Sequence, residues 1–134
     1  YLTKLDANEN TFDDDSILSF GFHKKEHRLS PRNAQVAANQ FDISLQEHRS
    51  KSLYQTDIKD SDILVYFDES HKIKLESYYC CYQLFSAADL LDNEYKHDYE
   101  INDPYNGTNE KVSQCYKKIV NAVDGLYRLK QESL

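Results

Sequence analysis

The stretch Asp62-Ile63-Leu64-Val65-Tyr66-Phe67-Asp68 decides the fold class. It is an unbroken run of β-branched, aromatic and other apolar residues between two aspartates, which is typical of a β-strand. Because no polar residues alternate with the apolar ones, we expect helices to cover this strand on both faces, as in a parallel sheet. The residues from Glu69 to Ser77 are predicted to form a helix. A strand followed by a helix indicates a layered α/β fold.

Two further apolar runs, Ile17 to Phe22 and Tyr79 to Phe85, are predicted to be strands of the same sheet. Between the first run and the central strand, Ser30-Pro31 predicts a helix start, with Ser at the N-cap and Pro at the first helical position. One face of that helix carries small and aromatic apolar residues, namely Ala34, Ala37, Ala38 and Phe41.

A long C-terminal helix follows Thr108, which is a suitable capping residue. An apolar stripe with a period of about 3.6 residues marks its buried face. The stripe consists of Val112, Cys115 or Tyr116, Ile119, Val123 and Leu126. With strands and helices alternating at this spacing, we predict a three-layer α/β domain with a short parallel sheet flanked by helices.

The beginning of the chain, from Tyr1 to Leu5, is predicted to be the last part of a helix, and Asn8 to Asp15 a polar, acidic loop. The sequence starts with Tyr and contains no Met. We therefore expect that residues which precede Tyr1 in the parent protein are missing here. On this interpretation residues 1–134 form a single, N-terminally incomplete domain.

The composition excludes several classes of partner. The formal charge of −7 argues against nucleic acid or an anionic membrane, because both are bound through basic surfaces. No apolar run approaches the ~18 residues of a membrane span, and no apolar leader is present. The three cysteines are expected to be reduced thiols, which is the usual state in the cytoplasm. We therefore predict a cytoplasmic protein that binds neither nucleic acid nor membranes.

The sequence Asp103-Pro104-Tyr105 is the strongest candidate for a catalytic motif. Alone it would be only a turn, because Asp and Pro both favour turns. Three further segments stand in a compatible order before it: Ser30-Pro31-Arg32 with the helix that follows, Glu47-His48-Arg49-Ser50, and the strand that ends in Asp68. This ordered set resembles the low-molecular-weight protein-tyrosine phosphatase family, whose fold is flavodoxin-like. Phe67 stands where that family usually has Met.

The resemblance implies a function and a role for each matching residue. It implies hydrolysis of phosphotyrosine in a protein, or of another aryl phosphate, through a cysteinyl-phosphate intermediate, without a metal or other cofactor. Asp103 would be the general acid and Tyr105 would line the substrate pocket. Ser19 and His48 would brace the phosphate-binding loop, where phosphate or sulfate ion would also bind.

The nucleophile that the resemblance requires is absent from these 134 residues. In that family a Cys is followed six positions later by Arg, whereas Cys80, Cys81 and Cys115 are followed there by Ser86, Ala87 and Asn121. The family's first strand, which lies in the middle of its four-stranded parallel sheet, is also missing. A thiolate is needed to attack phosphorus, so we expect the chain alone to be inactive.

Three alternatives remain open. The chain could be a non-catalytic binding or scaffold domain that kept the fold. An arsenate reductase shares this fold, but its cysteines are separated along the chain, unlike Cys80 and Cys81.

His23 and His27 have the i, i+4 spacing of a metal site on a helix. The residues between them are Lys24, Lys25 and Glu26, which indicate a solvated loop, so no metal is predicted.

Overall fold

Two short parallel strands, β1 (Ile63–Tyr66) and β2 (Gln83–Ser86), form the sheet at the centre of the molecule. Val65 is paired with Phe85 in their register. The computed structural model describes residues 17–55, 58, 63–78, 83–95, 100–105 and 107–132. The predicted helix end and acidic loop before residue 17, and the cysteines at positions 80 and 81, lie outside the described residues.

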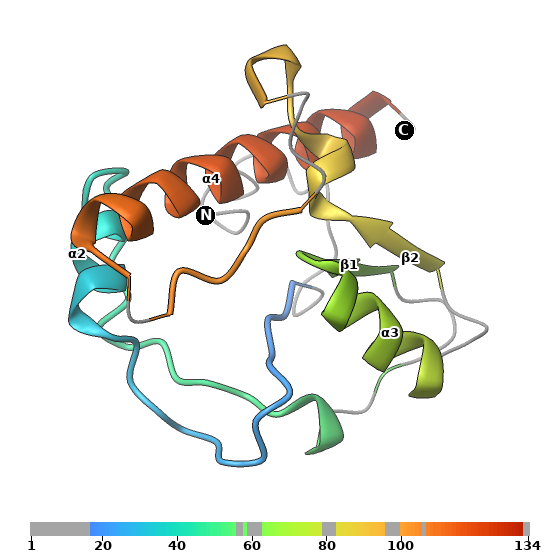
Figure 1. The fold of residues 1–134 in the computed structure, drawn as a ribbon, viewed down its shortest axis with the longest axis horizontal. Coiled ribbons are helices and arrows are strands. Elements are labelled where there is room, and N and C mark those ends of the chain that lie inside the picture. Colours follow the sequence, from blue (N-terminus) through green and yellow to red (C-terminus); the bar gives the residue numbers. More distant parts are fainter. Residues whose placement is uncertain are drawn as a thin grey trace.

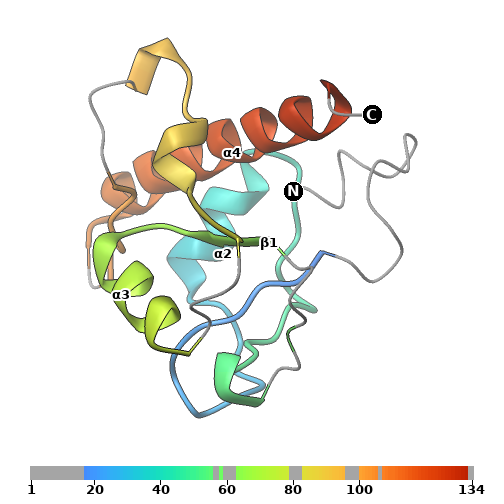
Figure 2. The same ribbon diagram turned by 90° about the vertical axis from the view of Figure 1, so that its right-hand side faces the viewer.

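Helices lie on both sides of the sheet, as predicted for an α/β fold. Helix α3 (Glu69–Tyr78) lies on one side of the strands and α4 (Asn109–Glu132) on the other, and α2 (Arg32–Asn39) packs against α4 (Figures 1 and 2). Short 3-10 turns join these elements: η1 (Leu53–Gln55), η2 (Ala87–Leu90) and η3 (Asn93–Tyr95). The strand, α3 and the C-terminal helix lie where the sequence predicts them.

The apolar core of the described residues consists of two clusters. Leu64 of β1 packs with Leu75 of α3 and with Leu53. On the side of α4, Ala87 packs with Ile101 and Ala122. Burial of such side chains stabilises the fold by ~25 cal/mol per Å² of apolar surface. The second cluster lies directly beneath the segment that leads to Asp103, so the core supports that loop.

The predicted strand from Ile17 to Phe22 is wrong. In residues 17–22 the structure contains only an isolated parallel bridge, between Gly21 and Ser52. Two hydrogen bonds hold this bridge, from the Gly21 N–H to the Lys51 carbonyl and from the Leu53 N–H to the Gly21 carbonyl. Leu18 and Ser19, which precede this bridge, are exposed, so burial of their side chains does not favour further strand pairing. A Gly inside a strand also weakens it, because no side chain packs there.

The predicted start of α2 is displaced by one residue. Pro31 occupies the N-cap position and its carbonyl accepts the Gln35 N–H at 3.1 Å, while no side chain caps the helix. The Ser30 carbonyl instead accepts a hydrogen bond from Gln35 Nε2 at 2.8 Å. The predicted apolar face is confirmed, because Ala37 and Ala38 are buried.

One face of β1 is less completely covered than predicted. Leu64 is 5% exposed, but Ile63 and Val65 on the opposite face are 48% and 37% exposed, and Phe85 on β2 is 41% exposed. Among the described elements, α4 packs mainly against α2 and η2. The apolar composition of β1 therefore predicts a strand correctly, but it does not predict that one face of the strand is partly exposed.

Candidate active-site loop

Two hydrogen bonds fix the segment that carries Asp103 to the sheet and to α3. The Ile101 N–H donates to the carbonyl of Phe67 at 2.8 Å, just beyond the end of β1. The Glu69 N–H, in the first turn of α3, donates to Glu100 Oε1 at 3.1 Å. The Ile101 side chain is 3% exposed. The residues before Asp103 are thus held by backbone pairing and by burial together.

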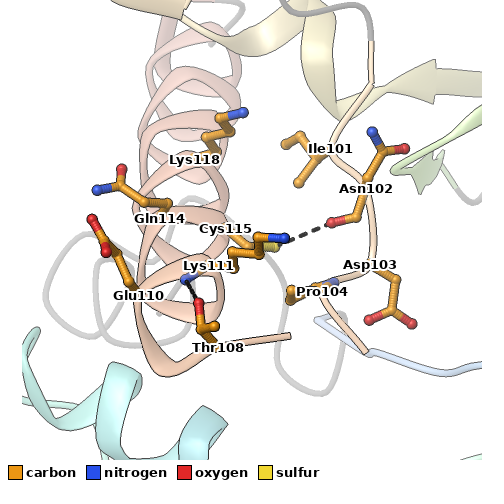
Figure 3. A pocket seen from close by; sticks show the side chains of 10 residues that line it. All are labelled: Ile101, Asn102, Asp103, Pro104, Thr108, Glu110, Lys111, Gln114, Cys115 and Lys118. Carbon is orange, nitrogen blue, oxygen red and sulfur yellow. Dashed lines mark hydrogen bonds between the residues drawn. The ribbon is translucent and has the colours of Figure 1, made fainter. Parts of the chain in front are cut away.

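The turn itself is closed by its own side chain and backbone. Asp103 Oδ1 accepts the N–H of Tyr105 at 3.1 Å, which is the Asx-turn that Asp favours. The Gly107 N–H donates to the Pro104 carbonyl at 2.6 Å. Asp103 is exposed, and Tyr105 is 80% exposed. Figure 3 shows Pro104 facing α4 while the Asp103 carboxylate turns away from that helix. The carboxyl group therefore has a fixed orientation and an open approach.

A hollow of about 520 Å³ separates this loop from the first three turns of α4. Thr108 caps the helix there, because its Oγ1 accepts the Lys111 N–H at 3.2 Å, as predicted. Lys111 and Lys118 bring positive charge to the hollow and Glu110 brings negative charge. Ten residues line it: Ile101, Asn102, Asp103, Pro104, Thr108, Glu110, Lys111, Gln114, Cys115 and Lys118 (Figure 3).

Cys115 joins α4 to the loop across this hollow. Its Sγ lies 3.6 Å from the Asn102 carbonyl oxygen, to which the thiol donates. Burial raises the pKa of the Cys115 thiol, the negative charge of Asp103 raises it further, and Lys118 offsets part of the rise. A protonated thiol is a poor nucleophile. Cys115 therefore holds the loop in place and is unsuited to attack phosphorus.

Asp68 has a structural role at the end of β1. Its Oδ1 accepts hydrogen bonds from the Ser70 hydroxyl and, at 3.0 Å, from the His71 N–H, and its Oδ2 lies 3.7 Å from His71 Nε2. Burial alone would raise the pKa of Asp68, but these hydrogen bonds and the His71 side chain bring it below its ordinary value. Asp68 thus caps α3, a structural role that an aspartate at the end of a strand can have.

Ser19 and His48, the two residues predicted to brace a phosphate-binding loop, are both exposed. Ser19 lies in the extended segment before Gly21. His48 lines a second, smaller hollow of about 180 Å³ together with Arg28 and Ser50. In the described part of the chain no hydrogen bond or ion pair joins Ser19 or His48 to Asp103. Their bracing role stays a prediction.

The described residues contain no group of three or more His, Cys, Asp and Glu side chains placed to hold a metal ion. His23 and His27 do not lie on a helix, and His27 has a φ of 61°. The His23 Nδ1 accepts the Lys25 N–H at 3.0 Å, a local loop contact. The i, i+4 spacing of these two histidines therefore does not place them on one helical face.

Comparison with known proteins assigns the family. The family model described as low molecular weight phosphotyrosine protein phosphatase matches residues 8–134. The chain belongs to this family. The match spans the Asp103 loop, the strand β1 and the helices described above, so the resemblance of the sequence segments is confirmed. Searches of curated protein sequences and of solved structures each gave no match. None of the helices in the described part has the length and apolar composition of a membrane span.

Sequence reasoning missed the residues that hold the Asp103 loop. Phe67 and Glu100 act through a carbonyl oxygen and a carboxylate that pair with distant backbone N–H groups. No local pattern marks such pairs. Cys115 did carry a signal, because it lies on the apolar stripe of the last helix. That stripe predicts burial but not the carbonyl oxygen that the thiol contacts.

Proposed function

We propose that this protein is a cytoplasmic phosphatase that hydrolyses phosphotyrosine in proteins or a similar aryl phosphate, with residues 1–134 acting as one domain. The observation that carries the proposal is the family match over residues 8–134. The geometry of the Asp103 loop supports it, because an exposed carboxyl group sits on a hydrogen-bonded turn that follows the buried Ile101.

In the proposed reaction a cysteine thiolate attacks phosphorus, and the bond between phosphorus and the phenolic oxygen breaks. Asp103 donates its proton to the departing phenolate oxygen. Its carboxylate then accepts a proton from the water that attacks the cysteinyl phosphate, which releases inorganic phosphate and the free thiolate. General acid–base help of this kind contributes typically ~10²–10⁴-fold. Tyr105, whose ring is exposed beside the acid, would contact the aromatic ring of the substrate.

We propose further that the nucleophile belongs to a Cys-x5-Arg segment outside these 134 residues. Within them no Cys has Arg six positions later, and the Cys115 thiol is held protonated. The backbone N–H groups of such a loop would stabilise the thiolate, and its Arg would bind the phosphoryl oxygens. Ser19 and His48 would support that loop by hydrogen bonds.

The alternative is a non-catalytic phosphatase-like domain that binds a partner, which residues 1–134, in which no Cys is followed by Arg six positions later, would also fit. Such a domain would bind phosphorylated ligands or other proteins without turnover. An arsenate reductase is less favoured, because Cys115 is engaged with the Asn102 carbonyl and carries a raised pKa.

Two measurements on the purified natural protein distinguish these possibilities. Intact mass with N-terminal peptide sequencing reveals whether a Cys-x5-Arg segment is present. Hydrolysis of p-nitrophenyl phosphate and of a phosphotyrosine peptide then tests activity. A protein that contains the segment and releases phosphate supports the proposal. A natural protein with neither the segment nor activity contradicts it, and turnover by residues 1–134 alone contradicts the proposed nucleophile.

A further inference from the structure

Two neighbouring segments carry a concentration of positive charge that the rest of this acidic chain lacks. Residues 23–32 and 47–51 contain six Lys and Arg residues against two Glu residues, a formal charge of +4, whereas the whole chain carries −7. We call the exposed cationic side chains of these segments the basic face; they are Lys24, Lys25, Arg28, Arg32, Arg49 and Lys51. His23, His27 and His48 are exposed in the same segments.

Backbone hydrogen bonds hold the two segments side by side. The His27 N–H donates to the Ser50 carbonyl at 2.8 Å, and the Ser50 N–H donates to the Arg28 carbonyl at 3.0 Å. Leu29 and Arg49 form an antiparallel bridge. In Figure 1 the first segment runs from the lowest part of the molecule up to the start of α2, which packs against α4. The charges are therefore brought together by a defined backbone arrangement and not only by proximity in sequence.

One acidic residue within the first segment does not neutralise this surface. Glu26 is half-buried, and its Oε2 accepts the N–H of the buried Ser52 at 2.8 Å. Its carboxylate thus points toward the interior and holds the first segment to the backbone at Ser52. The guanidinium groups of Arg28 and Arg49 also brace the backbone, through the carbonyls of Lys25 and Gln46 at 3.2 and 2.7 Å. The surface is preorganised, which lowers the entropy lost on binding.

A short packed path connects the basic face to the Asp103 loop. Phe22, which directly precedes the first segment, contacts His71 in a tilted arrangement with ring centroids 5.4 Å apart. His71 in turn lies 6.5 Å from the ring of Phe67. The Phe67 carbonyl holds Ile101, two residues before Asp103. A chain of packed side chains therefore links the start of the first basic segment to the segment that carries Asp103.

We propose that the basic face binds acidic segments of polypeptides and, on the proposed phosphatase function, the acidic residues that flank phosphotyrosine in the substrate. Carboxylates are the complementary ligands for clustered Lys and Arg, and such complementarity also accelerates encounter. Basic membrane-binding surfaces usually combine the charges with the apolar face of an amphipathic helix. Here the charges lie mainly on two paired loop segments and not on an amphipathic helix, which suits a peptide better than a bilayer.

The test measures binding without any chemistry. A fluorescein-labelled peptide with several Glu residues and no phosphate is titrated with the full natural protein, and its Gln analogue serves as the neutral control. We expect the Glu peptide to bind and the Gln peptide to bind at least tenfold more weakly. Affinity should fall between 0.1 M and 1 M NaCl, because the Debye length shrinks from about 10 Å to about 3 Å.

A charge-reversed protein locates the site. The triple variant Lys24→Glu, Lys25→Glu and Lys51→Glu leaves the bracing arginines intact. The matched control reverses three exposed or half-exposed cations on α3 and α4, with Lys72→Glu, Lys117→Glu and Arg128→Glu. We expect the first variant to bind the Glu peptide about tenfold or more weakly, since each exposed ion pair changes affinity up to roughly fivefold. The control should bind more tightly than the first variant, with similar melting temperatures.

Three results would overturn the assignment: no binding of the Glu peptide at low salt, equal weakening by both triple variants, or tighter binding to phosphatidylserine vesicles than to the peptide. Hydrolysis is read separately, with phosphotyrosine placed in the Glu and Gln peptides. Faster hydrolysis of the Glu form by the unaltered protein supports the substrate assignment. Binding without any hydrolysis supports the basic face and contradicts the phosphatase proposal.

Discussion

Replacing Gly125 by Ala should destabilise the protein, although Ala normally stabilises a helix. Gly125 lies inside α4 at its contact with η2. A Cβ added at this position would stand 2.2 Å from the carbonyl oxygen of Leu90 and 3.2 Å from its carbonyl carbon. Ordinary contacts to a Cβ begin near 3.4 Å, so the Leu90 carbonyl would have to retreat by roughly 1 Å.

The surrounding contacts resist that retreat. The Asp92 N–H donates to Asn121 Oδ1 at 2.9 Å, and Asn121 Nδ2 donates to Asp92 Oδ2 at 2.8 Å, which ties the chain just after Leu90 to α4. Overpacking of this kind costs about 1–3 kcal/mol. The helix gains about 0.5–1 kcal/mol when Ala replaces Gly. The expected net loss in the free energy of unfolding is about 1–2 kcal/mol.

Urea and thermal unfolding followed by circular dichroism measure this difference. For a domain of this size, a loss of about 1–2 kcal/mol lowers the melting temperature by about 4–8 °C. The matched control is Gly21→Ala, because a Cβ at Gly21 meets no atom within 4 Å. That variant should be unchanged or more stable by up to about 1 kcal/mol. If Gly125→Ala were as stable as the unaltered protein, the close approach of Leu90 to α4 would be refuted.

Three further predictions concern the carboxyl groups of Asp103 and Asp68. Asp103→Asn should lower kcat about 10²-fold or more for phenyl phosphate. The loss should be smaller for p-nitrophenyl phosphate, because p-nitrophenolate is a better leaving group and depends less on protonation. Equal losses of kcat for the two substrates would contradict a general acid. The same substitution should lower the pKa of the Cys115 thiol, because a negative charge beside it is removed; peptide-resolved alkylation rates measured against pH report the direction. Asp68→Asn should destabilise the protein at pH 7, and the difference should shrink as the pH falls through the lowered pKa of Asp68, because that carboxylate stabilises the fold only while ionised; urea midpoints from pH 7 to pH 3 test this.

The elements predicted correctly are those whose signal is contained in their own residues. β1 is a dense apolar run, and α4 combines a capping Thr108 with a long apolar stripe that includes the buried Val112. The run from Ile17 to Phe22 is interrupted by Ser19 and Gly21, and of its residues only Gly21 is paired, in an isolated bridge. Sequence composition gives the propensity of a segment, whereas pairing is decided by the partner.

The open face of β1 has the same kind of cause. Ile63, Val65 and Phe85 are as apolar as the residues that face α3, so composition cannot tell which of them a helix covers. In the described part of the chain, α4 is engaged with α2 and η2 and leaves these side chains exposed. A continuous apolar run therefore predicts a strand with two faces suited to burial, and the neighbouring elements determine how much of each face is buried.

The Asp103 loop is held by more contacts than its own turn supplies. A surface turn needs only its own hydrogen bonds, and Asp103 and Tyr105 supply one. This loop is instead fixed to the end of β1 through Phe67, to α3 through Glu100 and to α4 through Cys115. Three elements distant in sequence thus restrain one short segment whose acidic side chain stays in solvent. Burial at the base with an exposed carboxyl at the tip is the arrangement that a proton donor requires, since catalysis needs a fixed geometry and an open approach.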